Sequence, residues 1–265
     1  MRSALALARR EMIRFFRQPS RIVGAVAPPV LMWLLVASGF RSSFRTGGDG
    51  DSFGYFFPGT IVLVVLFASI FSTISVIEDR REGFLQAVLV SPVGPGPIVL
   101  GKVLGGTLLG LLQGGVLLAL VPALGLKTDV PALAAALGLL LAVSFGLTSL
   151  GFAIAWSLES AQGFHAIMNL FLIPMWLLSG AFFPLEGAPG WLHALMAVNP
   201  LTYGVAALRR ALGGAGGNLP SMAVSTAVTL AAAALLFALA AAVVARNPTG
   251  PERRKVRATK RDDTR

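Results

Sequence analysis

The stretch I-E-D-R-R-E-G-F-L-Q-A-V-L-V-S-P-V-G-P-G-P-I-V-L-G-K, Ile77 to Lys102, interrupts an otherwise apolar sequence. It combines charges of both signs, a short amphipathic run and a cluster of prolines and glycines, and it lies between two long apolar segments. A polar loop of this chemistry is a candidate contact site for another protein. We therefore take it as the reference point for the rest of the chain.

The composition is that of an integral membrane protein. Hydrophobic residues make up 55% of the 265 residues and charged residues 13%, whereas soluble domains carry about a quarter charged residues. Apolar windows of about 20 residues, each long enough to cross a ~30 Å hydrocarbon core as a helix, recur along the chain. The sequence predicts an all-α polytopic membrane protein with a six-helix transmembrane domain over residues 22–245. There is no cysteine, which excludes disulfides and thiolate metal sites.

Six segments are predicted to span the membrane, and a seventh is too broken by proline and glycine to do so. Along the third span Gly106, Gly110 and Gly114 recur every four residues, with Gly101 and Gly105 on an adjoining stripe, which predicts close helix packing. The broken segment, 184–217, is expected to form a re-entrant outer hairpin packed on protein. The expected spans are 22–40, 55–77, 98–121, 131–156, 164–183 and 221–245.

Residues 1–21 are predicted to form a cytoplasmic interfacial helix. Leu5, Met12 and Phe16 share one helical face with Ala8 and Phe15, and Arg10, Arg14 and Arg17 share the opposite face. A solvated basic tail is the alternative. Residues 246–265 form a basic tail, and an even number of spans places both basic termini on one side.

The charge distribution predicts the orientation and the location. The positive-inside rule puts both termini and the polar loop 78–97 on the cytoplasmic side of a bacterial-type cell membrane. Arg209 and Arg210 are then left at the outer face. The net charge of +10 resides mainly next to apolar spans at the two ends, which favours anionic lipid as the partner and disfavours nucleic acid.

No catalytic or nucleotide site is expected. The six spans carry no Asp, Glu, Lys or Arg away from their edges, which disfavours ion-coupled transport and indicates that energy comes from a partner. Residues 96–103 match G-x-x-x-x-G-K, but Val103 replaces the hydroxyl residue that binds Mg²⁺, and no strand precedes the match. We therefore predict that the chain is not an enzyme and holds no cofactor or metal.

The opening stretch contains a short amphipathic helix. Phe84, Leu85, Val88 and Leu89 form one apolar face, opposite Glu82. Such a helix could dock in a groove of a soluble partner, or it could rest on lipid.

The stretch resembles the cytoplasmic loop of type-2 ATP-binding-cassette (ABC) export permeases. In that family an acidic and basic cluster, Gly-x-Leu and an L-x-S-P-V segment precede a basic residue at the next span. A second match lies at L-S-G-A-F-F-P, residues 178–184, and at N-P-L-T-Y, residues 199–203, followed by Leu208 and Arg209. In the first match the fitting residues are Glu78, Arg80, Glu82, Gly83, Leu85, Leu89, Ser91, Pro92, Val93, Gly101 and Lys102.

The resemblance implies a transmembrane permease subunit that pairs with itself and with two cytoplasmic ABC ATPase subunits. It implies export of a hydrophobic or amphipathic compound such as a drug, an antibiotic or a lipid-like molecule. It also implies an ATPase coupling contact at Glu78, Arg80, Arg81, Glu82, Phe84, Leu85, Val88 and Leu89. The second and fifth spans would line the substrate route, with Phe67, Phe71, Ser75, Asn169, Phe171, Met175 and Trp176 as candidates.

Two alternatives stay open. Relatives with similar spans move polysaccharides or lipid-linked glycans, and an apolar wall discriminates poorly among cargoes. A non-transporting membrane scaffold or a passive channel also fits spans that lack ionisable groups.

Overall fold

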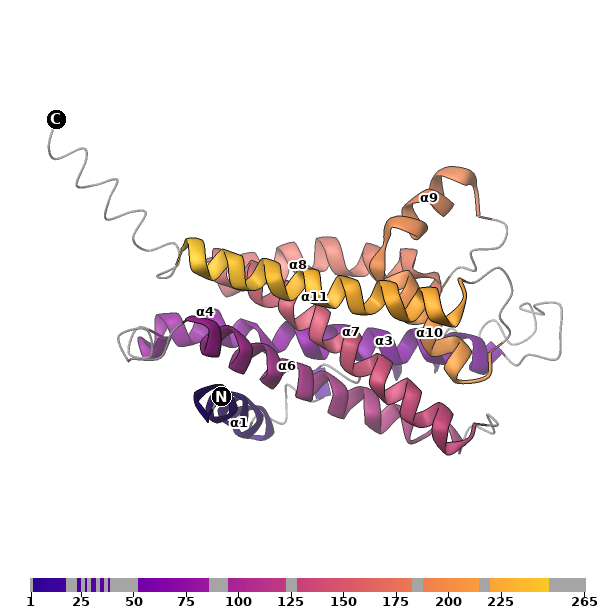
Figure 1. Ribbon diagram of the computed structural model, residues 1–265, viewed down its shortest axis with the longest axis horizontal. Coiled ribbons are helices and arrows are strands. Elements are labelled where there is room, and N and C mark those ends of the chain that lie inside the picture. The colour runs from indigo at the N-terminus through magenta and orange to yellow at the C-terminus, as the bar shows by residue number, and fades with distance from the viewer. Residues whose placement is uncertain are drawn as a thin grey trace, which may run out of the picture.

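The computed structural model describes residues 2–17, 52–85, 95–122, 128–182, 188–214 and 220–247, with scattered positions between 23 and 38. Every regular element in these ranges is a helix. The long helices lie side by side in one bundle (Figure 1). Helix α1 (Arg2–Phe16), helix α4 (Ile74–Arg81) and the C-terminal end of α11 (Met222–Arg246) lie at one end, and α9 (Gly190–Val198) and α10 (Pro200–Ala211) lie at the other (Figure 1).

Within the described residues, five stretches are long and apolar enough to cross a membrane, and they coincide with five of the six predicted spans. The predicted span 22–40 lies outside the described residues except for scattered positions. The helices that form these stretches are α3 (Ser52–Ser72) with α4, α6 (Pro95–Leu118), α7 (Val130–Ser157), α8 (Ala161–Trp176) with the π-helix η2 (Leu177–Ala181), and α11. The stretches themselves are Tyr55–Arg81, Gly96–Leu118, Val130–Ser157, Ala161–Ala181 and Met222–Arg246.

Side-chain caps fix where several helices begin. Asp129 accepts a hydrogen bond from the backbone N–H of Ala132 at the start of α7, and Ser160 accepts one from Gly163 at the start of α8. Helix α6 begins at Pro95, three residues earlier than the predicted Ile98. Proline is favoured in the first helical turn, where its missing N–H has no intrahelical acceptor, so Pro95 starts the helix.

The predicted glycine stripe of α6 is confirmed as a packing surface. A Cβ atom at Gly106 would overlap Ser72 and Thr148, and one at Gly110 would overlap Ser69 and Ser144. Without side chains at these positions, α6 approaches α3 and α7 closely. The hydroxyl groups of Ser69 and Ser144 then form a hydrogen bond of 2.8 Å, and Ser144 also donates to the carbonyl oxygen of Thr107 over 3.0 Å.

The segment predicted as a re-entrant hairpin contains two short helices, α9 and α10, joined at Asn199. Its depth in a membrane stays a prediction. Arg209 lies on α10, at the end of the bundle opposite α1 and α4, and its side chain is buried there. Its placement at the outer face of the membrane stays a prediction. The guanidinium group donates to the carbonyl oxygen of Gly180 over 2.9 Å and lies 4.2 Å from the ring centroid of Tyr55. These contacts offset the loss of hydration and turn the side chain inward.

Candidate functional site

Helix α1 packs across α6 near one end of the bundle (Figure 1). Charged side chains from α1, α4 and α6 meet there. We call this group the ion cluster. It contains three basic and three acidic residues, so its formal charges cancel. Its members are Arg10, Glu11 and Arg14 from α1, Glu78 and Asp79 from α4, and Lys102 from α6.

Lys102 is the centre of the ion cluster. Its ammonium group donates to Glu11 over 2.6 Å, to the hydroxyl of Ser75 over 3.2 Å and to the carboxylate of Asp79. The side chains of Lys102, Glu11 and Asp79 are 3%, 5% and 0% exposed. Breaking a buried ion pair by removing one partner costs roughly 3–5 kcal/mol, so these three residues depend on one another.

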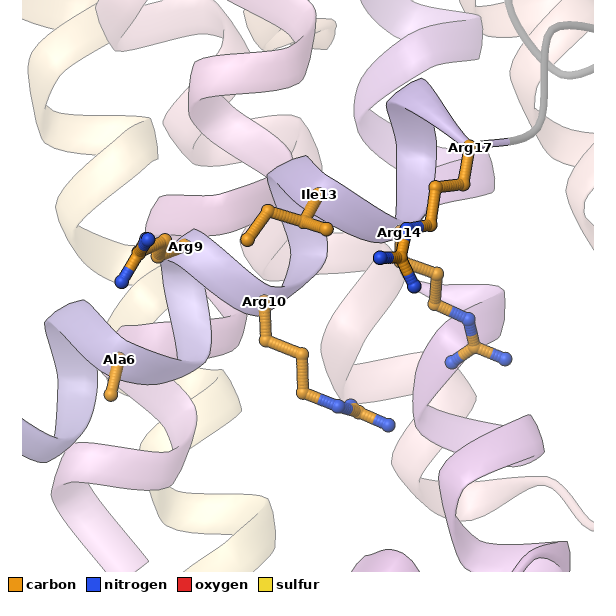
Figure 2. Close-up of a pocket in the computed structure, with 6 residues that line it drawn as sticks. All are labelled: Ala6, Arg9, Arg10, Ile13, Arg14 and Arg17. Carbon is orange, nitrogen blue, oxygen red and sulfur yellow. The ribbon is translucent and has the colours of Figure 1, made fainter.

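Two arginines of α1 complete the ion cluster. Arg10 donates to both carboxylate oxygens of Asp79 over 2.8 and 2.9 Å. Arg14 donates to Asp79 over 3.0 Å and to Glu78 over 2.9 Å. Both guanidinium groups point to the same side of α1 (Figure 2). The hydrogen bonds to Asp79 raise the pKa of the Arg10 guanidinium above its ordinary value. Bidentate arginine contacts with a carboxylate also fix geometry, so they set the angle at which α1 crosses α4.

Glycines of α6 allow α1 to come close enough for these contacts. A Cβ atom at Gly101 would lie 2.8 Å from the carbonyl oxygen of Ala4 and from the Cβ of Leu7. One at Gly105 would lie 2.8 Å from the Cβ of Glu11. Helix α1 therefore packs on the adjoining glycine stripe that the sequence predicts.

Helix α4 is also attached to the end of α7. Arg80 donates to the carbonyl oxygens of Trp156 and Leu158 over 2.8 and 2.9 Å. These carbonyls lie at the C-terminal end of α7, which attracts cations. The indole N–H of Trp156 donates in turn to the carbonyl oxygen of Asn247 over 2.9 Å. Helix α4 is therefore bonded directly to α1, α6 and α7. Through Trp156 it is also linked to the end of α11.

The residues of the predicted ATPase coupling contact divide into two groups. Arg81 and Glu82 are exposed at the C-terminal end of α4, and Glu78 is half-buried in the ion cluster. Arg80 and Leu85 are buried, and the ring of Phe84 lies 3.7 Å from the Arg10 guanidinium. Phe84 and Leu85 therefore pack on the chain itself. Val88 and Leu89 lie outside the described residues.

The sequence reasoning did not select Glu11, Asp79 and Lys102 as a site. One signal was present, because Glu11 is the only acidic residue among the basic residues of the N-terminal segment. An acid kept in such a segment indicates a specific basic partner. Asp79 gave no separate signal, since it lies in a run of charged residues.

The residues predicted to line the substrate route occupy different environments. Phe67 and Phe71 are half-buried on α3, with ring centroids 5.3 Å apart, and Asn169 and Phe171 are exposed on α8. Ser75 belongs to the surroundings of Lys102. Two others take part in packing at the far end of the bundle: the Trp176 indole donates to the carbonyl oxygen of Gly59 over 2.9 Å, and the Met175 carbonyl accepts from Asn199 over 2.6 Å.

Fold and site together define a multi-pass α-helical membrane protein whose charged groups gather at the helix ends. The chain belongs to the family described as ABC-2 type transporter, whose model matches residues 2–212.

Individual relatives carry transport names. The chain is 24% identical over 207 residues to a protein of Cyanophora paradoxa named as the transport permease ycf38, covering 77% of this chain and 71% of the relative. It is 23% identical over 214 residues to the daunorubicin resistance ABC transporter permease protein DrrB1 of Streptomyces coeruleorubidus, covering 78% and 74%. It is 27% identical over 151 residues to a protein of Escherichia coli K12 named as the multidrug ABC transporter permease YbhR, covering 55% and 40%.

Proposed function

We propose that the chain is the membrane subunit of an ATP-driven exporter and that ATP is hydrolysed by separate cytoplasmic subunits. The match of residues 2–212 to a family of transport permeases carries this proposal. Two copies of the chain with two ATPase subunits make the working assembly. Both termini lie in the cytoplasm, and the assembly resides in the cell membrane.

The attachment of α4 supports a coupling role for this end of the bundle. Arg81 and Glu82 are exposed, while Asp79 and Arg80 next to them bind three other helices. Pressure on the exposed residues reaches the buried ones through a single helical turn. Because Asp79 has charged partners on two helices, a tilt of α4 moves α1 and α6 together or breaks buried ion pairs.

The cargo is a hydrophobic or amphipathic compound of the drug or antibiotic class. The relatives named for daunorubicin resistance and for multidrug transport favour this class over a glycan. The exposed face of α8 with Asn169 and Phe171, together with Phe67 and Phe71 of α3, forms the wall offered to the cargo. One amide among aromatic rings suits an amphipathic molecule with few polar groups.

The test uses charge reversal at the exposed residues of α4. Arg81→Glu combined with Glu82→Arg is expected to reduce co-purification of the ATPase and ATP-dependent export of daunorubicin from loaded vesicles. Arg246→Glu is the matched control, because Arg246 is exposed at the last turn of α11 at the same end of the bundle.

Two outcomes would contradict the proposal. Unchanged ATPase binding and export in the double variant would remove α4 from the coupling path. A purified chain that carries no ATPase and passes daunorubicin without ATP would favour the channel.

A further inference from the structure

Helix α1 has three sides, and two of them are occupied. Ala4, Leu7 and Ala8 are buried on the side that faces α6. Arg10 and Arg14 use the second side to bind the carboxylates of α4. The third side remains exposed and is unusual in mixing large apolar and basic side chains.

The exposed apolar residues of this third side are substantial. Leu5 is 61% exposed and Phe16 is 55% exposed, and Ile13 is exposed between them along the helix. A helix that met only water on this side would leave these side chains hydrated at a free-energy cost proportional to their area. An apolar environment is therefore expected beside α1.

Two exposed basic side chains lack acidic partners among the residues that the structure describes. The guanidinium groups of Arg9 and Arg17 make no ion pair and no hydrogen bond with those residues, in contrast to those of Arg10 and Arg14. One open hollow is lined by Ala6, Arg9, Arg10, Ile13, Arg14 and Arg17 (Figure 2). Among the residues that the structure describes, no acidic side chain lines this hollow, since Glu11 turns toward Lys102. Arg10 and Arg14 are neutralised by Asp79 and Glu78, so the charges of Arg9 and Arg17 are the ones left for an anion.

The depth of α1 decides which anion it meets. Its contacts with α6 fall at Gly101 and Gly105, within the first turns of the span Gly96–Leu118. At 1.5 Å per residue these glycines lie roughly 8 to 14 Å along the span from its first residue. The polar layer of a bilayer is several ångströms thick on each side of the hydrocarbon core. If the span enters the bilayer at Gly96, α1 lies near the boundary between this polar layer and the hydrocarbon core, from which long arginine side chains can extend to the lipid phosphates.

We propose that the exposed side of α1 binds the phosphate groups of anionic phospholipids. Leu5 and Phe16 enter the acyl region, and Arg9 and Arg17 bind the phosphates. Binding of this type is strengthened by buried apolar area and by attraction to anionic lipid, and each arginine near the surface contributes about a fivefold gain in affinity. The bound lipid then holds α1 in the orientation in which Arg10 and Arg14 reach Asp79.

The test measures lipid binding to the full-length chain by native mass spectrometry, with dioleoyl-phosphatidylglycerol and dioleoyl-phosphatidylcholine as probes. The unaltered chain is expected to bind phosphatidylglycerol more tightly than phosphatidylcholine. The variant Arg9→Gln with Arg17→Gln is expected to lose more than tenfold of its phosphatidylglycerol affinity and to keep its affinity for phosphatidylcholine. Arg246→Gln serves as the matched control and is expected to keep both affinities.

A charge-conserving variant separates lipid binding from folding. Arg9→Lys with Arg17→Lys keeps the charges, so it should retain the preference for phosphatidylglycerol even if the glutamine variant is poorly folded. Equal affinity of the unaltered chain for both lipids would overturn the proposal. So would unchanged phosphatidylglycerol binding in the glutamine variant. Loss of a co-purifying ATPase without loss of lipid binding would assign this side of α1 to a protein partner and would likewise overturn it.

Discussion

The carboxylate of Glu11 and the ammonium group of Lys102 form an ion pair of 2.6 Å between residues that lie 91 positions apart in the chain. The pair joins α1 to the first turns of a membrane span. Since Lys102 also binds Asp79, both carboxylates share one cation inside the protein. The position of α1 therefore depends on charges that belong to other helices.

Neutralising Asp79 tests how much the ion cluster contributes to stability. Asp79→Asn leaves Lys102, Arg10 and Arg14 without their shared carboxylate, so we expect a loss of roughly 3–5 kcal/mol. Thermal unfolding of the detergent-solubilised chain measures the effect. Glu82→Gln is the control, because Glu82 is well exposed and its pair with Arg14 is 3.5 Å long, and about 1 kcal/mol or less is expected. Equal melting temperatures for the two variants would show that Asp79 is not a structural anchor.

The coupling between Glu11 and Lys102 can be measured with a double-mutant cycle. Lys102→Met leaves two buried carboxylates, whereas Lys102→Met combined with Glu11→Gln leaves only Asp79, which Arg10 and Arg14 still bind. The double variant is therefore expected to be more stable than the sum of the single effects by roughly 0.5–3 kcal/mol. Thermal unfolding of the four proteins gives the coupling energy. Strict additivity would mean that the two residues do not interact in the membrane.

Close packing of α6 predicts that alanine substitutions at Gly110 and at Gly138 change the free energy of unfolding by different amounts. In Gly110→Ala the added methyl overlaps the hydroxyl groups of Ser69 and Ser144, so we expect a loss of about 1–3 kcal/mol. Gly138 on α7 has open space around its missing side chain, and Gly138→Ala is expected to be neutral or to stabilise by up to about 1 kcal/mol. Denaturant or thermal unfolding distinguishes the pair. A neutral Gly110→Ala would place α6 farther from α3 and α7.

Arg209, a buried cation at the opposite end of the bundle, is expected to contribute to the stability of the fold. Arg209→Gln removes the hydrogen bond to the Gly180 carbonyl and the contact with the Tyr55 ring. Because hydrogen bonds from charged groups are stronger than neutral ones, we expect a loss of about 1.5–3 kcal/mol. Arg246→Gln, at an exposed helix end, is expected to stay within about 0.5 kcal/mol of the unaltered chain. Thermal unfolding that showed no difference between them would indicate that Arg209 is hydrated.

The proposed pairing of two chains is tested at α8, because a cargo route bounded by this exposed face would be closed by the same face of a second copy. The sequence has no cysteine, so single-cysteine variants need no further changes. Phe171 is exposed on α8, and Phe171→Cys is expected to form a disulfide-linked dimer in oxidised membranes. Leu235→Cys on α11 is equally exposed and is expected to remain monomeric. Electrophoresis without reductant distinguishes the cross-linked dimer from the monomer for both variants. A dimer of Leu235→Cys and a monomer of Phe171→Cys would place the pairing surface on α11.

Much of the fold follows from local features of the sequence. Long apolar segments predict the spans, and glycines four residues apart predict a close helix contact on α6, because both properties reside in neighbouring residues. Helix α6 extends three residues before the predicted start of the span at Ile98, because hydropathy gives the apolar segment and not the first helical turn. The burial of Arg209 was not predicted, because its acceptor, the carbonyl of Gly180, comes from a distant turn.

The candidate site was predictable only in part. The charged run after α3 predicts a contact region for a partner, and Arg81 and Glu82 are exposed there. That this region binds an ATPase stays a prediction. The sequence could not show that Phe84 lies against Arg10 or that Leu85 is buried, because these contacts depend on how α1 is placed. Amphipathic periodicity gives a face but not the surface that covers it.

The sequence by itself determined that this chain is a multi-pass helical membrane protein and that a run of charged residues follows Ile77. Hydropathy, glycine spacing and charge runs are properties of short sequence segments, so they can be recognised without knowledge of the fold. Only the tertiary structure decided that Glu11, Asp79 and Lys102 neutralise one another. Partners far apart in sequence become neighbours through the rotation and crossing of whole helices, and the buried charge of each is tolerated only because the others are present.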